Sequence, residues 1–220
     1  MDPNNAVIQL CVRGMREEAE GRPADARAAF LRAWNAATDD YERCVAAHYL
    51  ARHQPTPEET LRWNQQCLDL ADAVGDERVG GFYASLHTNM GRAHQALGHV
   101  EQARRHYRLA AAHLADAPDD GYGEWVRYGI AEGLRATGGA APRPAEETLR
   151  DLLNALCARA DLLSLCLLLP AYVGDLGGQE DLARLDTAMR RLHATRRLPD
   201  EEQAALTRAI DALQGAHPSA

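Results

Sequence analysis

Aromatic residues are scarce in this chain: they make up 5% of its 220 residues, with only two Phe and three Trp. β-branched residues are also few, and apolar and polar residues hardly ever alternate, so strands are not indicated. Because 46% of the residues are hydrophobic, the core must be built mainly from Leu, Ala and Val, which is typical of helices. We therefore predict an all-α protein.

Long basic runs and long apolar runs are both missing. The net charge of −8 opposes a nucleic-acid backbone, so nucleic acid is not an expected partner. The N-terminal stretch lacks the features of a signal peptide. The most apolar segment, Leu162 to Val173, is uncharged but shorter than the ~20 residues that span a bilayer. We expect a cytoplasmic protein without a membrane partner.

Motifs for metal, phosphate or nucleophilic chemistry are lacking as well. The five cysteines form no C-x-x-C pair, which favours reduced, packed thiols: Cys11, Cys44, Cys67, Cys157 and Cys166. The nine histidines include no i, i+4 pair or H-E-x-x-H motif, and their spacings of seven separate the rings along a helix. No phosphate loop or G-x-S-x-G motif occurs. The expectation is no metal, no cofactor and no catalytic residue.

A repeated spacing is the main positive signal. Gly14 is followed after seven residues by Gly21, and then by three small or aromatic residues, Ala26, Phe30 and Ala33. The same offsets from Gly91 reach Gly98, Ala103, Tyr107 and Ala110. This pattern predicts helix hairpins: the first Gly permits close approach, the second lies at the turn, and a ring fills the gap between small residues.

These positions resemble the tetratricopeptide repeat family, most clearly from Asn89 to Tyr107. A weaker copy has Thr60, Asn64 and Cys67 in its second helix, with His48 and Pro55 in place of the glycines, and a fourth aligns Gly138 with Gly98. The long repeats are similar to arrays in bacterial signal-responsive regulators and kinesin light chains. The resemblance implies a right-handed α-α superhelix of helix hairpins.

The predicted helices cover residues 5–20, 23–37, 40–53, 57–74, 77–97, 100–116, 122–137, 145–159, 161–174, 179–196 and 200–214. Within them, Gly129 and Gly133 favour close helix packing over phosphate binding. Residues 1–138 form the predicted repeat region. Residues 139–220 form a predicted helical capping subdomain that continues the solenoid, because the last repeat exposes an apolar face.

The concave face is the predicted binding site, since in the family the first helix of each hairpin lines it. Carrying that rule over by offset from Gly91 gives the candidate site residues Tyr49, Arg52, Ser85, Thr88, Asn89, Arg92, Gln95, Trp125, Tyr128 and Glu132. Arg, Tyr and Trp are common anchors of binding surfaces. Alternatively, these residues form a hydrated polar groove in which Glu132 neutralises Arg92.

The preferred function is a non-catalytic module that binds a peptide segment or partner protein, and a regulatory role is compatible with it. Arg52 and Arg92 beside aromatic rings favour a carboxylate on that ligand. Two alternatives stay open. In the first, the chain is a self-associating scaffold that forms a homo-oligomer through residues 162–173. In the second, it is an unrecognised enzyme that uses the groove as its active site.

Overall fold

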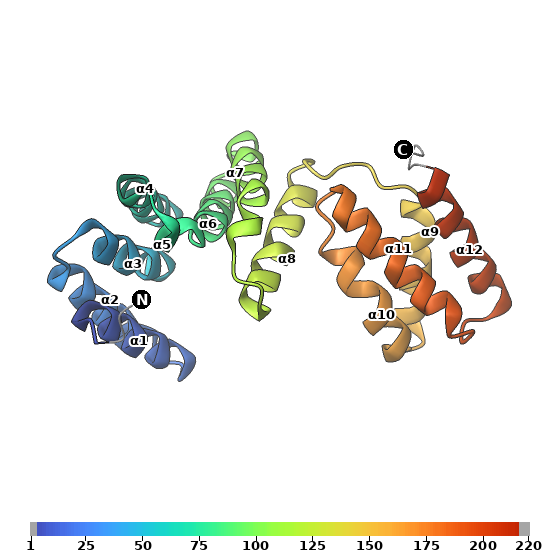
Figure 1. Ribbon diagram of the computed structural model, residues 1–220, viewed down its shortest axis with the longest axis horizontal. Helices are drawn as coiled ribbons and strands as arrows, with labels where there is room; N and C mark the ends of the chain where they lie inside the picture. The colour runs from blue at the N-terminus through green and yellow to red at the C-terminus, as the bar shows by residue number, and fades with distance from the viewer. Residues whose placement is uncertain (1–3, 216–220) are drawn as a thin grey trace. The chain divides into compact units, whose positions relative to one another are not determined.

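The computed structural model describes residues 4–215, and every regular element in that part of the chain is helical (Figure 1). The chain forms two compact units, the first ending at Gly139 and the second beginning at Ala140. Residues 1–3 and 216–220 of the two predicted domains lie outside the described residues. No helix between residues 4 and 215 is long and apolar enough to cross a membrane.

The first unit consists of three helix hairpins and a final single helix, joined by short turns (Figure 1). Its elements are α1 (Ala6–Ala19), α2 (Pro23–Ala36), α3 (Asp40–Leu50), η1 (Ala51–His53), α4 (Pro57–Val74), α5 (Glu77–Gly80), α6 (Tyr83–Ala96), α7 (Val100–Ala112), η2 (Leu114–Asp116) and α8 (Gly121–Ala136). The two helices of each hairpin pack against each other, α1 with α2, α3 with α4 and α6 with α7. The predicted all-α hairpin repeat is confirmed.

Polar side chains fix the start of most of these helices. A side-chain oxygen of the residue before the helix accepts hydrogen bonds from first-turn N–H groups at Asn5, Asp39, Thr56, Asp76 and Asp120. Such caps satisfy N–H groups that have no partner within the helix. Each cap therefore stabilises the first turn of its helix.

The glycines of the repeated spacing lie against the rings, as predicted. A Cβ atom added to Gly14 would be 2.3 Å from the Phe30 ring, and one added to Gly91 would be 2.8 Å from the Tyr107 ring. Both rings are fully buried. Only a residue without a side chain lets the first helix approach so closely, so the glycine and the ring together set the hairpin spacing.

The Tyr107 ring also receives the next helix. A Cβ atom at Gly133 of α8 would come within 2.1 Å of it. The reading of Gly129 and Gly133 as residues that permit close helix packing is therefore confirmed for Gly133. One buried ring thus packs against two glycines from the first helices of successive repeats.

In the second hairpin the glycine and ring positions hold His48 and Asn64, and two thiols pack between its helices. The Sγ atoms of Cys44 in α3 and Cys67 in α4 lie 3.6 Å apart, and both residues are fully buried. Each thiol also donates to the other residue's carbonyl oxygen. The prediction that these cysteines are packed as small core residues is confirmed.

The predicted helix over residues 77–97 is interrupted, which corrects that boundary. α5 ends at Gly80 and α6 begins at Tyr83, with a turn at Gly81 and Phe82 between them. Two consecutive glycines weaken a helix. A Cβ atom at Gly81 would lie 3.4 Å from the Asp116 carbonyl oxygen, so the η2 turn packs closely where the helix breaks.

The second unit is a ring of four helices: α9 (Glu146–Ala158), α10 (Leu162–Val173), α11 (Gln179–Ala194) and α12 (Asp200–Gly215). Each helix packs on the next, and α12 also contacts α9. Leucines from all four helices form one core that includes Leu149, Leu168, Leu185 and Leu206. Within this unit the chain therefore closes on itself like a bundle.

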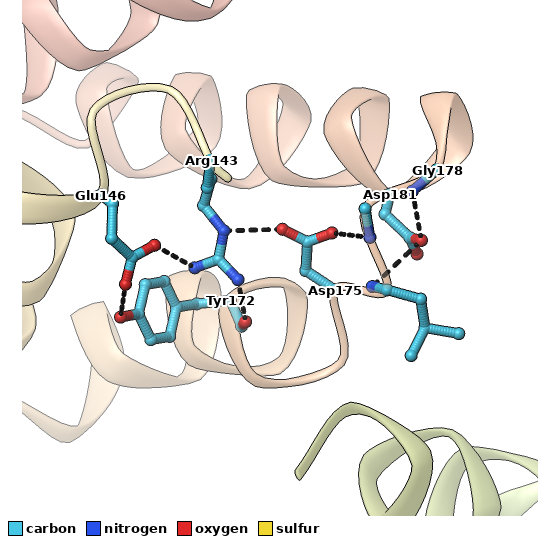
Figure 2. Close-up of polar contacts among 8 residues, drawn as sticks. Arg143, Glu146, Tyr172, Asp175, Gly178 and Asp181 are labelled. Carbon is cyan, nitrogen blue, oxygen red and sulfur yellow. Dashed lines mark hydrogen bonds and ion pairs between the residues drawn. The ribbon is translucent and has the colours of Figure 1, made fainter. Parts of the chain in front are cut away.

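A buried ion pair fastens the segment before α9 to the end of α10. The Arg143 guanidinium donates through Nε to Asp175 Oδ2 at 2.6 Å and through Nη2 to the Tyr172 carbonyl oxygen at 3.1 Å. Figure 2 shows how these side chains lie. The guanidinium carbon lies 4.2 Å from the centre of the Tyr172 ring, whose hydroxyl donates to Glu146. The Asp175 carboxylate also accepts from the Gly177 N–H. Because all these partners belong to the second unit, the cluster serves to stabilise the fold of that unit.

Candidate functional site

The predicted groove residues lie on the first helices of the second and third hairpins and on the final single helix of the first unit. Tyr49 is on α3 and Arg52 on η1, which continues it. α6 carries Ser85, Thr88, Asn89, Arg92 and Gln95, and α8 carries Trp125, Tyr128 and Glu132. α6 packs directly against α8, so these two rows face each other.

Three cavities follow these helices, and each is named here for one residue that lines it. The Tyr49 cavity, of about 380 Å³, is lined by Met15, His48, Tyr49, Arg52, Arg78, Gly81, Phe82, Pro118, Asp120 and Tyr122. The Asn89 cavity, of about 460 Å³, has walls from Ala51–Arg52, Gln54–Pro57, Thr60, Asn89, Arg92, Ala93 and Trp125. The Glu132 cavity, of about 430 Å³, is lined by Arg92, Gln95, Ala96, Tyr107, Gly129, Glu132, Gly133 and Ala136.

Neighbouring cavities of this groove share two of the predicted residues. Arg52 lines both the Tyr49 and the Asn89 cavities, and Arg92 lines both the Asn89 and the Glu132 cavities. Each volume lies within the range of pockets that hold small molecules or side chains. A ligand that extends along the groove would therefore pass both arginines.

The two arginines differ in their partners. The Arg52 guanidinium lies 5.0 Å from the Tyr49 ring centre and forms a 2.6 Å ion pair with Glu18. The Arg92 guanidinium lies 5.1 Å from the ring centre of Trp125, which is 50% exposed. Among residues 4–215, no carboxylate lies within ion-pair distance of Arg92. Arg92 thus offers an uncompensated cation on an acidic protein.

Gly129 of α8 makes room for this cation. A Cβ atom at Gly129 would be 2.5 Å from Arg92 Nη2 and 3.4 Å from Thr88 Cγ2. The missing side chain lets the guanidinium lie between α6 and α8. The sequence indicated close packing at Gly129, but not that the neighbour would be the arginine of the groove.

Ser85 and Thr88 are not on the surface of the groove, which corrects their prediction as ligand contacts. They are 3% and 1% exposed. Their hydroxyls donate to carbonyl oxygens of their own helix or its start, at Phe82 and Ala84. Thr88 is buried because α6 and α8 pack together at Gly129. An offset rule gives the side of a helix that faces the groove, but not how deeply a residue on that side is covered.

The other predicted residues divide between the groove and its edge. Asn89 is half-buried in the wall of the Asn89 cavity. Gln95 lines the Glu132 cavity and accepts a hydrogen bond from the Tyr107 hydroxyl at 3.0 Å. The Tyr128 hydroxyl donates to Glu124 on its own helix, and Tyr128 lines none of the three cavities.

His48 is a groove residue that was not predicted. It is 4% exposed, its ring packs against those of Tyr49 and Phe82, and its Nδ1 atom has no hydrogen-bond partner. Burial, with a smaller effect from the charge of Arg52, lowers the pKa of His48 to about 3, so the imidazole is neutral. The signal was present in the sequence, because His48 occupies the position of Gly14 and Gly91 in the other hairpins.

Five histidines come together across the α6 and α7 hairpin. The rings of His99, His94, His106, His87 and His113 follow one another with centroids 5.2 to 6.0 Å apart, and the Nδ1 atoms of His87 and His106 are 3.2 Å apart. Because α6 and α7 are antiparallel, histidines seven residues apart on one helix alternate in space with histidines seven residues apart on the other. The spacing along either helix alone does not indicate this row. Within the described residues, no three His, Cys, Asp or Glu side chains are placed to hold one metal ion.

The three central rings of this row, those of His87, His94 and His106, favour the neutral form. Burial lowers the pKa of His106 to about 4, with added effects of His87, His94 and Arg105, and it also lowers the pKa of His87 and His94. Asp72 opposes the effect at His87. Neutral rings can share hydrogen bonds and stack, so the row is a packing feature of the hairpin.

No protein-family model and no curated protein matches this sequence. Similar solved structures include a candidate kinesin light chain with nearly identical TPR-like repeats from Podosopora anserina, with 16% identity and a TM-score of 0.49 over 98% of each chain. A single-residue variant of that protein gives 15% identity and a TM-score of 0.48 over 96% of this chain and 95% of that one. The observation in this chain that supports a tetratricopeptide-like repeat fold is the packing of Gly14 on Phe30, and of Gly91 and Gly133 on Tyr107.

Proposed function

We propose that the protein is a non-catalytic, cytoplasmic binding module that holds a peptide segment or partner protein in the groove lined by Tyr49, Arg52, Asn89, Arg92 and Trp125. Any regulatory role would then act through the bound protein. The observation that carries this proposal is the Arg92 guanidinium, which lies over an exposed Trp ring and lacks a carboxylate partner within residues 4–215.

Arg92 favours a carboxylate on the ligand. A guanidinium can bind a carboxylate through two parallel hydrogen bonds, and a neighbouring ring covers the apolar part of the ligand. Arg52 is the weaker anchor because Glu18 already pairs with it, and a ligand must first displace that carboxylate. We therefore place the acidic group of the ligand at the junction of the Asn89 and Glu132 cavities.

The rest of the groove suits a polypeptide chain. The Asn89 amide can donate to a carbonyl and accept from an N–H group, as an extended peptide requires. The Tyr49 cavity is lined by Met15, Phe82 and two tyrosines, and is therefore suited to an apolar side chain. Ligand chemistry would then change along the groove, from apolar at the Tyr49 cavity to acidic at Arg92.

Selection of peptides from a random displayed library on the full chain tests this assignment. The selected peptides should share an acidic residue, and replacing it with the matching amide should weaken binding by at least about tenfold, measured by fluorescence anisotropy. Selected peptides that lack an acidic residue, or whose amide forms bind equally well, would place the specificity elsewhere.

A further inference from the structure

The outward side of α10 is an apolar stripe. Leu162 and Leu163 are 68% and 59% exposed, the two highest values among large hydrophobic residues between 4 and 215, and Cys166 and Pro170 are also exposed. At 100° per residue these four fall within about 100° of the helix surface. Ser164 and Leu168, the buried residues of α10, point to the opposite side.

The other three helices of the ring have ordinary outer sides. Their exposed positions include charged residues on α9 (Glu147, Arg150), on α11 (Arg184, Arg190) and on α12 (Arg208, Asp211). α10 has no charged residue from Leu162 to Val173. In a four-helix ring the side facing away from the core is normally polar, so the α10 stripe has the composition of an interface.

We propose that the α10 stripe is a self-association surface and that its occupant is the α10 stripe of a second copy of this chain. An uncharged stripe needs an uncharged partner, because a charge buried against it would lose its hydration without compensation. The remaining exposed large hydrophobic residues of the described chain are on α1, α2, α7 and α8: Val12, Met15, Leu31, Val100, Tyr122 and Trp125. Each of those four helices also carries charged residues, so α10 is the uncharged surface that the described part of this chain provides.

Symmetry places one residue at the centre of such a contact. Leu162, Cys166 and Pro170 are four residues apart along the stripe, with Cys166 in the middle. In a two-fold pairing the same patch meets itself, so the residue at the axis contacts its own copy. Two Cys166 thiols should therefore lie close together. Because one 12-residue helix buries less than the ~800 Å² per partner of a stable complex, the dimer should be weak, with a dissociation constant on the order of 10 µM.

Diamide crosslinking of the full chain tests this contact, since the oxidant takes two electrons from two thiols and joins them as a disulfide. Cys157 on α9 is the matched control, because the two cysteines are the exposed thiols among residues 4–215. The Cys157→Ser variant should form covalent dimers as the wild type does, and Cys166→Ser should not. Equal crosslinking through Cys157, or none through Cys166, would overturn the proposal.

Sedimentation equilibrium provides a second, non-covalent readout. Leu163→Glu should raise the dimer dissociation constant at least about a hundredfold, because the interface would bury an unpaired carboxylate. Leu31→Glu, on an exposed Leu of α2, should leave it unchanged. A wild-type chain that stays monomeric up to roughly ten times the expected dissociation constant would overturn the proposal. Crosslinking keeps the test valid if Leu163→Glu fails to fold.

Discussion

Replacing His48 with Phe should remove much of the acid sensitivity of the first unit. In the folded chain His48 is buried between the rings of Tyr49 and Phe82, and its pKa is lowered from 6.5 to about 3. In the unfolded chain it takes up a proton as the pH falls through its ordinary pKa. Between these two values the unfolded state binds more protons, so the free energy of unfolding falls as the pH falls.

The size of the effect follows from the pKa difference. One pKa unit corresponds to about 1.4 kcal/mol, so lowering the pH from about 7 to about 4.5 should cost the wild type roughly 3 kcal/mol through His48 alone. A Phe ring at this position keeps the aromatic contacts and takes up no proton. At neutral pH the variant should be within about 1 kcal/mol of wild type, because the change also removes a buried nitrogen without a partner.

Urea unfolding followed by tryptophan fluorescence measures this directly. The three tryptophans of the chain, Trp34, Trp63 and Trp125, all belong to the first unit, so the signal reports on that unit alone. The difference in unfolding free energy between wild type and His48→Phe should change by roughly 3 kcal/mol between the two pH values. If both proteins lose the same stability on acidification, His48 is not held neutral and the reasoning fails.

Arg143→Ala should destabilise the second unit by about 3–5 kcal/mol, since it leaves a buried carboxylate without its cation; unchanged hydrogen-exchange protection in that unit would contradict this. Gly91→Ala should cost the first unit about 1–3 kcal/mol in the fluorescence assay, because its Cβ would lie 2.8 Å from the Tyr107 ring. Gly129→Ala should instead displace the flexible end of Arg92, weakening binding of a selected peptide about tenfold with little loss of stability. Wild-type affinity in that variant would show that the guanidinium position is unimportant.

The sequence predicted the hairpins because their spacing depends on local residue types. Gly14 and Gly91 could be matched to Phe30 and Tyr107 by counting residues, and the structure places each glycine against its ring. What could not be predicted was the closing of the second unit, where α12 contacts α9. That contact joins residues distant in sequence and depends on leucine packing, for which no repeated spacing exists.

The site was predicted less completely than the fold. Offsets from Gly91 correctly brought Arg92 and Trp125 together, because both follow from the geometry of neighbouring first helices. The same offsets also gave Thr88, which is buried in the structure. Its burial depends on how closely α6 and α8 approach each other, and residue offsets contain no information on that distance. His48 was noted only as a departure from the glycine pattern, and its role in the groove wall required the positions of the surrounding rings.

The most direct test of the groove is the affinity of one selected acidic peptide for wild type, Arg92→Ala and Arg92→Lys. Loss of a charge-assisted contact should cost about 2–3 kcal/mol in Arg92→Ala, a roughly 30- to 150-fold weaker binding, and Lys should restore only part of it. Arg108→Ala, an exposed arginine on α7, is the control and should bind as wild type does. An Arg92→Ala chain that folds normally and binds the peptide with wild-type affinity would contradict the account.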